Sequence, residues 1–352
     1  MPRLRPSRAL PDDRFGTAVG TVLGVTAALA VWLAGASGVA AHGYAPSEPP
    51  TAASLLLDWT FEPLPTVAIF IAIGWWFWAV GRVNAAHPAN KVPRRRTWYF
   101  LAGMFAIALA LISGIDRYDT ILFSVHMTQH VLLILVSAPL LALAAPMTLL
   151  LRVSSHETRK RWLLPFLHSR VVRVVSNPVV AWLIMAMVMW GSHFSPLFDA
   201  ALEDPLIHDF EHVLFLTAAI LFWWPVVALD PAPSRMGHPG RLTDVFLQMT
   251  QNTFLAVVIL GAPTVLYHHY ATLNLAWLPD PLSDQKLAAG VMWIAGDIIF
   301  IGALMALMFG WMRSEERATP RADREAAEDL VEIRVREKRL ADRLAEERGE
   351  RP

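Results

Sequence analysis

The chain has 352 residues, of which 55% are hydrophobic and 17% charged, and it carries 14 tryptophans. Soluble proteins usually contain about 25% charged residues, so this composition indicates an integral membrane protein. The formal net charge is zero, and the absence of cysteine excludes disulfides, thiolate copper chemistry and iron–sulfur clusters. Any bound metal must therefore be held by histidine, methionine, carboxylate or water.

The chain begins with a basic and then an apolar segment. Four arginines within the first 14 residues precede an apolar run over about 17–40 that ends in small residues. This order fits either a retained signal anchor or a cleaved signal peptide, and we expect residues 1–41 to form that unit. Cleavage after Ala41 would leave His42 at the new amino terminus, where its free amine and imidazole could chelate copper together.

Seven later segments have the length and apolarity of membrane-spanning helices, since about 20 mostly apolar residues cross roughly 30 Å of hydrocarbon. They lie at about 64–82, 98–115, 122–150, 179–195, 207–229, 245–269 and 287–312. The predicted fold class is therefore all-α. It is a polytopic membrane helix bundle of seven core spans within residues 42–312, plus the amino-terminal signal anchor or cleaved signal peptide.

Basic and acidic loops alternate along the chain. Lysine and arginine cluster in the segments 82–96, 152–173 and 235–241, whereas the intervening loops are acidic or nearly neutral. Lysine and arginine accumulate on the cytoplasmic side of membrane proteins. The pattern predicts a multi-pass protein of the inner or plasma membrane with a cytoplasmic carboxyl terminus; a retained amino-terminal run would add an eighth span.

Residues 313–352 form a dense mixture of arginine and glutamate. Apolar side chains recur there at helical three-and-four spacing, which predicts a charged cytoplasmic amphipathic helix, either solvated or docked on a partner. The apolar positions are Ala326, Leu330, Ile333, Leu340 and Leu344. The sequence has no glycine-rich phosphate loop and no nucleic-acid patch.

Two His-x-x-x-His pairs, His126 with His130 and His208 with His212, stand at the predicted outer ends of the third and fifth spans. Residues four apart share one helix face, so each pair can present two imidazoles to one ion. His193 falls at the same depth on the fourth span. Because ionisable side chains are costly near a membrane, these five residues predict a metal site, with a structural hydrogen-bond network as the alternative.

The ligand type favours copper, with zinc less likely, because imidazole and thioether ligands without thiolate suit copper. Met127 points about 100° away from His126 on a regular helix, so it is either a ligand or an ordinary packing residue. Glu211 could orient an imidazole N–H or be a plain interfacial carboxylate. His268 and His269, at the predicted end of the sixth span, are expected to pack at the interface.

Asp297 lies about ten residues into the last span, near mid-bilayer at 1.5 Å of rise per residue. A carboxylate at this depth should face the bundle interior. Its role is either a step in an ion or proton path or a structural hydrogen bond to polar groups of the sixth span, such as Gln248, Gln251 or Asn252.

Three stretches carry a family resemblance. They are residues 123–133 with their continuation over 138–146, residues 193–225, and residues 283–293. Together they resemble the bacterial membrane-integral cytochrome c oxidase assembly factors of the CtaG type, over about residues 55–312. The resemblance implies a seven-span bundle, a role in maturing haem-copper oxidase, and a part in providing copper to the copper B centre of subunit I. The histidines that it carries over are His126, His130, His193, His208 and His212.

We therefore predict a non-enzymatic assembly factor that binds copper at the outer membrane face and delivers it to the oxidase. The expected partners are cytochrome c oxidase subunits, a copper chaperone and membrane lipid, without nucleic acid. A membrane di-metal oxygenase or hydroxylase is one alternative, because His-x-x-x-His pairs also occur in fatty-acid desaturases. A copper permease is another, and a haem-binding electron carrier is a third; paired histidines on one helix suit a small ion better than haem.

Overall fold

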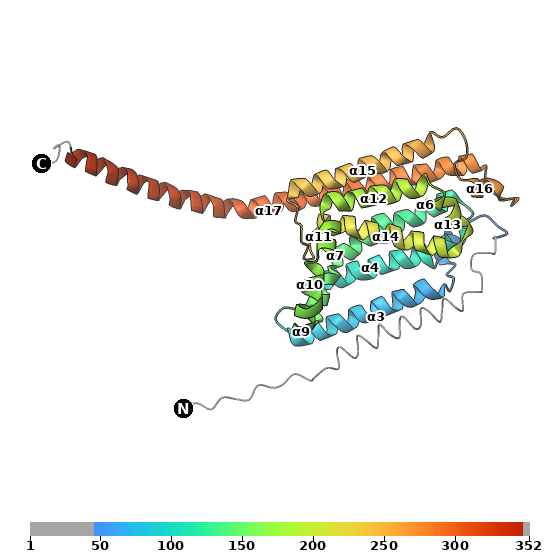
Figure 1. Ribbon diagram of the computed structural model, residues 1–352, viewed down its shortest axis with the longest axis horizontal. Coiled ribbons are helices and arrows are strands. Elements are labelled where there is room, and N and C mark those ends of the chain that lie inside the picture. The colour runs from blue at the N-terminus through green and yellow to red at the C-terminus, as the bar shows by residue number, and fades with distance from the viewer. Residues whose placement is uncertain (1–45, 348–352) are drawn as a thin grey trace, which may run out of the picture.

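The computed structural model describes residues 46–347, and every regular element within that range is a helix (Figure 1). The predicted all-α class is therefore confirmed. The expected amino-terminal unit and His42 lie outside the described residues.

Six helices of the described chain are long and apolar enough to cross a membrane. A seventh span results if α12 and α13, which are bent by 67° relative to each other, are counted together. The helices in these spans are α3 (Pro63–Ala86), α4 (Arg94–Leu111) with α5 (Gly114–Tyr118), α6 (Phe123–Val131) with η1 (Leu132–Ser137), α7 (Ala138–Ala144) and α8 (Pro146–Val153), α12 (Pro178–His193) with α13 (Leu197–Glu203), α14 (Pro205–Val227), α15 (His238–Leu260) and α17 (Pro281–Glu347).

Short helices cap the two ends of the bundle (Figure 1). At one end lie α9 (His156–Thr158), η2 (Arg159–Leu163), α10 (Leu164–Leu167) and α11 (Arg170–Val175). We call it the basic end, because this connection carries five lysines and arginines between residues 159 and 173. At the other end lie α13 and α16 (His268–Thr272), beside the start of α6 and the last residue of α12. We call this the histidine end; α2 (Ala52–Leu57) packs near it against α5.

The sixth predicted span ends earlier than expected. Helix α15 stops at Leu260, and His268 and His269 begin the separate helix α16. Gly261 follows α15, and Pro263 has no N–H group with which to continue a helix. The prediction that these two histidines end the span is therefore wrong.

The third span is irregular just after its histidine pair. The wide π-helical turn η1 follows α6 directly, and turns of this kind are often found at functional sites. The Trp223 indole of α14 donates a hydrogen bond of 3.0 Å to the Ile134 carbonyl inside this turn. Further on, Ala145 adopts a left-handed conformation with φ of 56°, and Pro146 then starts α8.

The charged tail continues the last span without a break. Helix α17 runs for 67 residues and extends well beyond the basic end (Figure 1). Leu330, Ile333, Leu340 and Leu344 are all exposed on it. The predicted amphipathic helix over 313–352 is thus helical through Glu347, while its side of the membrane stays a prediction.

Candidate metal centre

Hydrogen bonds from side chains fix the starts of the two helices that carry the histidine pairs. The side-chain oxygen of Asp204 accepts hydrogen bonds from the Leu206 and Ile207 amides at 2.8 and 3.3 Å, which starts α14 just before its pair. On α6, the Ser124 hydroxyl donates to Asp284 of α17 at 2.5 Å. These contacts hold the first turns of both helices, where His126 and His208 lie.

The four paired imidazoles form a quadrilateral between α6 and α14. Ring centroids are 4.5 Å apart for His126 and His130, and 4.3 Å apart for His208 and His212. Across the two helices, His126 lies 5.4 Å from His208, and His130 lies 6.0 Å from His212. All four side chains are at most 5% exposed. The two equally spaced histidine pairs therefore form one buried cluster in the folded structure.

His193, the last residue of α12, joins this cluster from a third helix. Its ring lies 5.5 Å from Phe198 and 6.3 Å from Phe215. The same two phenylalanines pack on His126 and His130, at 5.0 and 4.4 Å. The Nδ1–H of His193 donates to the Met189 carbonyl at 2.7 Å, so Nε2 carries the lone pair.

Two buried carboxylates complete the cluster. Glu211 Oε2 lies 3.8 Å from His126 Nε2, and Asp119 Oδ2 lies 3.7 Å from His208 Nε2. Two trios result, each with one ligand atom per residue within 4.8 Å of the others. They are Asp119 with His208 and His212, and Glu211 with His126 and His130. Glu211 was among the residues predicted from the sequence, whereas Asp119, in a predicted acidic loop, was not.

Gln129, inside the first histidine pair, fixes the tautomer of His212. Its side-chain amide donates to the Ala110 carbonyl at 3.0 Å and to Asp116 at 3.3 Å. Because a carbonyl only accepts, the Gln129 oxygen must be the atom that faces His212 Nε2, at 2.9 Å. His212 therefore donates from Nε2 and has its lone pair on Nδ1.

The chemistry of the cluster fits a cation. Both ring nitrogens of His126 and His130, and Nε2 of His193, are buried without a hydrogen-bond partner in the described part of the chain. An unsatisfied buried polar group costs about 1–3 kcal/mol, and a cation would supply the missing partner. Ligand atoms around a tetrahedral ion are about 3.3 Å apart, so the distances of up to 4.8 Å within each trio would shorten by up to about 1.5 Å.

Outside the spans, burial raises the pKa of the Asp119 carboxyl well above its usual range. Burial likewise raises the pKa of Tyr270, whose hydroxyl donates to the Asp119 carbonyl at 2.9 Å. A cation bound by the Asp119 carboxylate therefore competes with a proton.

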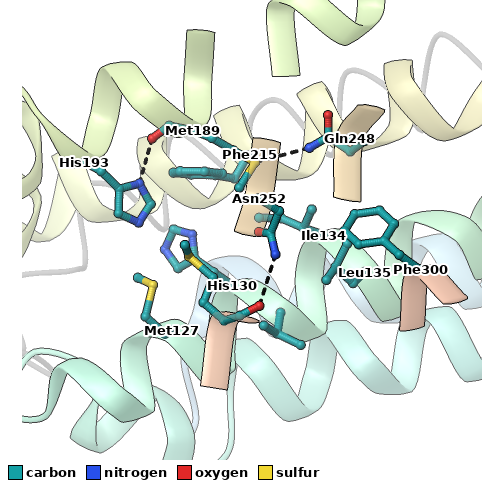
Figure 2. Close-up of a pocket in the computed structure, with 12 residues that line it drawn as sticks. Met127, His130, Ile134, Leu135, Met189, His193, Phe215, Gln248, Asn252 and Phe300 are labelled. Carbon is teal, nitrogen blue, oxygen red and sulfur yellow. Dashed lines mark hydrogen bonds between the residues drawn. The ribbon is translucent and has the colours of Figure 1, made fainter. Parts of the chain in front are cut away.

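A cavity of about 20 Å³ adjoins the cluster, with room for about one water molecule. Figure 2 shows Met127 and His130 of α6 on one side of it, and Met189 and His193 of α12 on the other. Met292 also lines it. Met127 therefore shares a cavity with His130 and His193. This holds although Met127 directly follows His126 and so points away from it on a regular helix.

Three other predicted residues lie apart from the trios. Asp297 accepts hydrogen bonds of 3.0 Å from the Thr253 hydroxyl and from the Trp293 indole. Its partner on the sixth span is therefore Thr253. His269 Nε2 donates to the Thr120 carbonyl at 2.8 Å, which ties α16 to the loop before α6. His268 is exposed.

Fold and site together define a class of protein: a helical membrane protein of several spans, with a buried histidine–carboxylate cluster at one end of its bundle. Residues 74–314 match the cytochrome c oxidase caa3 assembly factor (Caa3_CtaG) family, and the chain belongs to that family. The predicted family is thereby confirmed.

Three mycobacterial proteins are also similar to this chain. Uncharacterized proteins of Mycobacterium bovis and Mycobacterium tuberculosis are each 32% identical over 298 residues, which cover 82% of this chain and 45% of theirs. An uncharacterized protein of Mycobacterium leprae is 29% identical over 292 residues, or 81% of this chain and 44% of its own. The chain thus spans less than half the length of these relatives. No solved structure matches it.

Proposed function

We propose that this protein is a non-enzymatic assembly factor for haem-copper cytochrome c oxidase. It binds copper through the buried histidine cluster and delivers it to the copper B site of subunit I. The single observation that carries the copper step is the convergence of five imidazoles from three helices, with unpartnered buried nitrogens on His126, His130 and His193. Family membership supports the role in oxidase assembly.

The metal ligands in this proposal come from the five clustered histidines, and the carboxylates of Glu211 and Asp119 can complete the coordination. Met127 is a candidate thioether ligand, because it lines the same cavity as His130 and His193. Imidazole and thioether donors favour copper over zinc. Each trio supplies three ligands, fewer than the four of a closed tetrahedral site, so an ion held there keeps an open coordination position through which a partner can take it.

Delivery requires docking on oxidase subunits, and loading requires a source of copper such as a chaperone. We assign the histidine end to the outer side of the cell membrane and the basic end to the cytoplasm, because lysine and arginine accumulate in cytoplasmic loops. Residues 42–312 then form the membrane bundle and residues 313–352 a cytoplasmic helix, with residues 1–41 as the amino-terminal unit.

The test replaces one imidazole of each pair. His130→Ala and His212→Ala should each lower the copper bound by the purified protein, and the copper content and activity of the oxidase in cells, while the protein stays in the membrane. His87→Ala, an exposed histidine at the basic end, is the matched control and should change neither. Normal oxidase copper in both cluster variants would reject the proposal.

Metal analysis also separates the two main alternatives. Two irons per chain in anaerobically purified protein would favour a di-metal oxygenase and contradict copper binding. Copper uptake by sealed vesicles that contain the protein would favour a permease over delivery. The cavity beside the cluster holds about one water molecule, which suits storage of an ion better than its passage through the bundle.

A further inference from the structure

The cluster contains more ligands than one ion uses. Five imidazoles and two carboxylates lie together, whereas a tetrahedral copper or zinc site takes four protein ligands at most. The two trios share no residue, and each by itself brings its ligand atoms within 4.8 Å. A single ion would leave at least three buried ligands unused.

Each trio has the same composition of two imidazoles from one helix and one carboxylate. Asp119 stands 3.7 Å from His208, and Glu211 stands 3.8 Å from His126. The two trios adjoin where the His126 and His208 rings stack, with centroids 5.4 Å apart. The arrangement is thus two equivalent sets of donors side by side.

The charges also divide evenly. One carboxylate per trio neutralises one monovalent copper ion, so two such ions can lie next to each other in a buried site without an excess of positive charge. A single ion would leave the second carboxylate buried without a cation. Charge balance therefore favours one ion for each trio.

We propose that the cluster holds two copper ions side by side, one at each trio. This inference rests on the proposed function and sets its stoichiometry. The trios differ in one respect: His193 Nε2, a buried lone pair, lines the same cavity as His130 and can add a fourth ligand to the trio of Glu211. The position at Asp119 keeps three ligands and is the more open one, so its ion exchanges more easily.

The experiment counts ions in full-length protein purified in detergent. Monovalent copper is titrated anaerobically against a chromophoric chelator, in a background that replaces the histidines outside the cluster by glutamine. Those replaced are His42, His87, His156, His168, His238, His268 and His269. We expect two copper ions per chain, with the ion at Asp119 bound more weakly.

Variants then assign the two positions. Asp119→Asn and Glu211→Gln should each leave one copper, and the double variant none. Asp119→Glu, which keeps the carboxylate, should retain both. The matched control is Asp297→Asn, a carboxylate held by Thr253 and Trp293 away from the cluster, which should also retain both.

Outcomes separate the inference from the proposed function. One copper per chain in the parent protein overturns the pair of positions and leaves copper binding intact, and this count decides even if a variant fails to fold. Two coppers that persist in both single variants also overturn the inference, because the ions then lie elsewhere. No copper at all overturns both proposals.

Discussion

At the scale of single residues, the hydrogens on the imidazoles decide which nitrogens can bind an ion. Gln129 and the Met189 carbonyl each accept one imidazole N–H, from His212 and His193 respectively. Partners of this kind orient metal-binding histidines and raise their basicity. Gln129 is therefore a positioning residue, which acts on an ion only through His212.

Removal of this partner should weaken copper binding without changing the number of ions. We expect Gln129→Leu to lower copper affinity by about 10–100-fold, the usual cost of losing such a support. The matched control is Gln285→Leu. Like Gln129, Gln285 makes three hydrogen bonds through its side-chain amide. It accepts from the Leu266 amide and donates to the Ile259 and Thr264 carbonyls, away from the cluster. Competition with a chelator measures the copper affinity of both variants. Equal affinity in the two would contradict the role of Gln129 as a positioning residue.

The sequence offered the histidines of the cluster and Glu211 as candidates, but gave no sign of Asp119 or Gln129. His126 with His130 and His208 with His212 were recognisable because helical spacing places both members of a pair on one face. Asp119 has no such spacing, since it lies in the connection between α5 and α6 and reaches His208 only through the fold. Gln129 likewise has no distinguishing pattern in the sequence, because its hydrogen bond to the Ala110 carbonyl exists only in the folded structure.

At the scale of elements, hydropathy located the spans and local backbone chemistry corrected their ends. The fourth span turns by 67° after His193, where Ser195 and Pro196 follow, so the predicted end at 195 falls inside a bend. The last span and the charged tail are one helix, which continues through Gly310 and Pro320 although both residue types are unfavourable inside a helix. The amino-acid composition changes from apolar to charged near Arg313, whereas the backbone stays helical.

Helix α14 ends at a residue whose conformation suits glycine better than alanine. Ala228 has φ of 50° and caps the helix through its N–H to the Trp224 carbonyl. A left-handed conformation costs a non-glycine residue about 1 kcal/mol or more. Ala228→Gly should therefore stabilise the protein by about 1 kcal/mol and raise its thermal midpoint in detergent.

Helix α3 offers the control for this change. Ala72 lies inside α3, where glycine costs about 0.5–1 kcal/mol relative to alanine, so Ala72→Gly should lower the midpoint. Thermal unfolding followed by intrinsic tryptophan fluorescence checks both variants. If both variants lowered the thermal midpoint, the left-handed conformation of Ala228 would not destabilise the protein.

At the scale of the whole molecule, the two ends of the bundle differ in charge and in chemistry. The basic end carries the arginines of η2 and α11, and the histidine end carries the cluster with its carboxylates. Copper delivery to an oxidase site reached from outside requires the histidine end to face outward. Orientation is therefore the property of the whole chain on which the proposal depends.

Single cysteines can test this orientation directly, because the chain has no cysteine of its own and so gives no background. Asn274→Cys lies just after α16 at the histidine end, and Asn90→Cys lies beyond α3 at the basic end; both positions are exposed. We expect a membrane-impermeant maleimide to label Asn274→Cys in intact spheroplasts and Asn90→Cys only after lysis. The reverse pattern would place the cluster in the cytoplasm, on the side where desaturase-like histidines lie, and would remove the argument for delivery from outside.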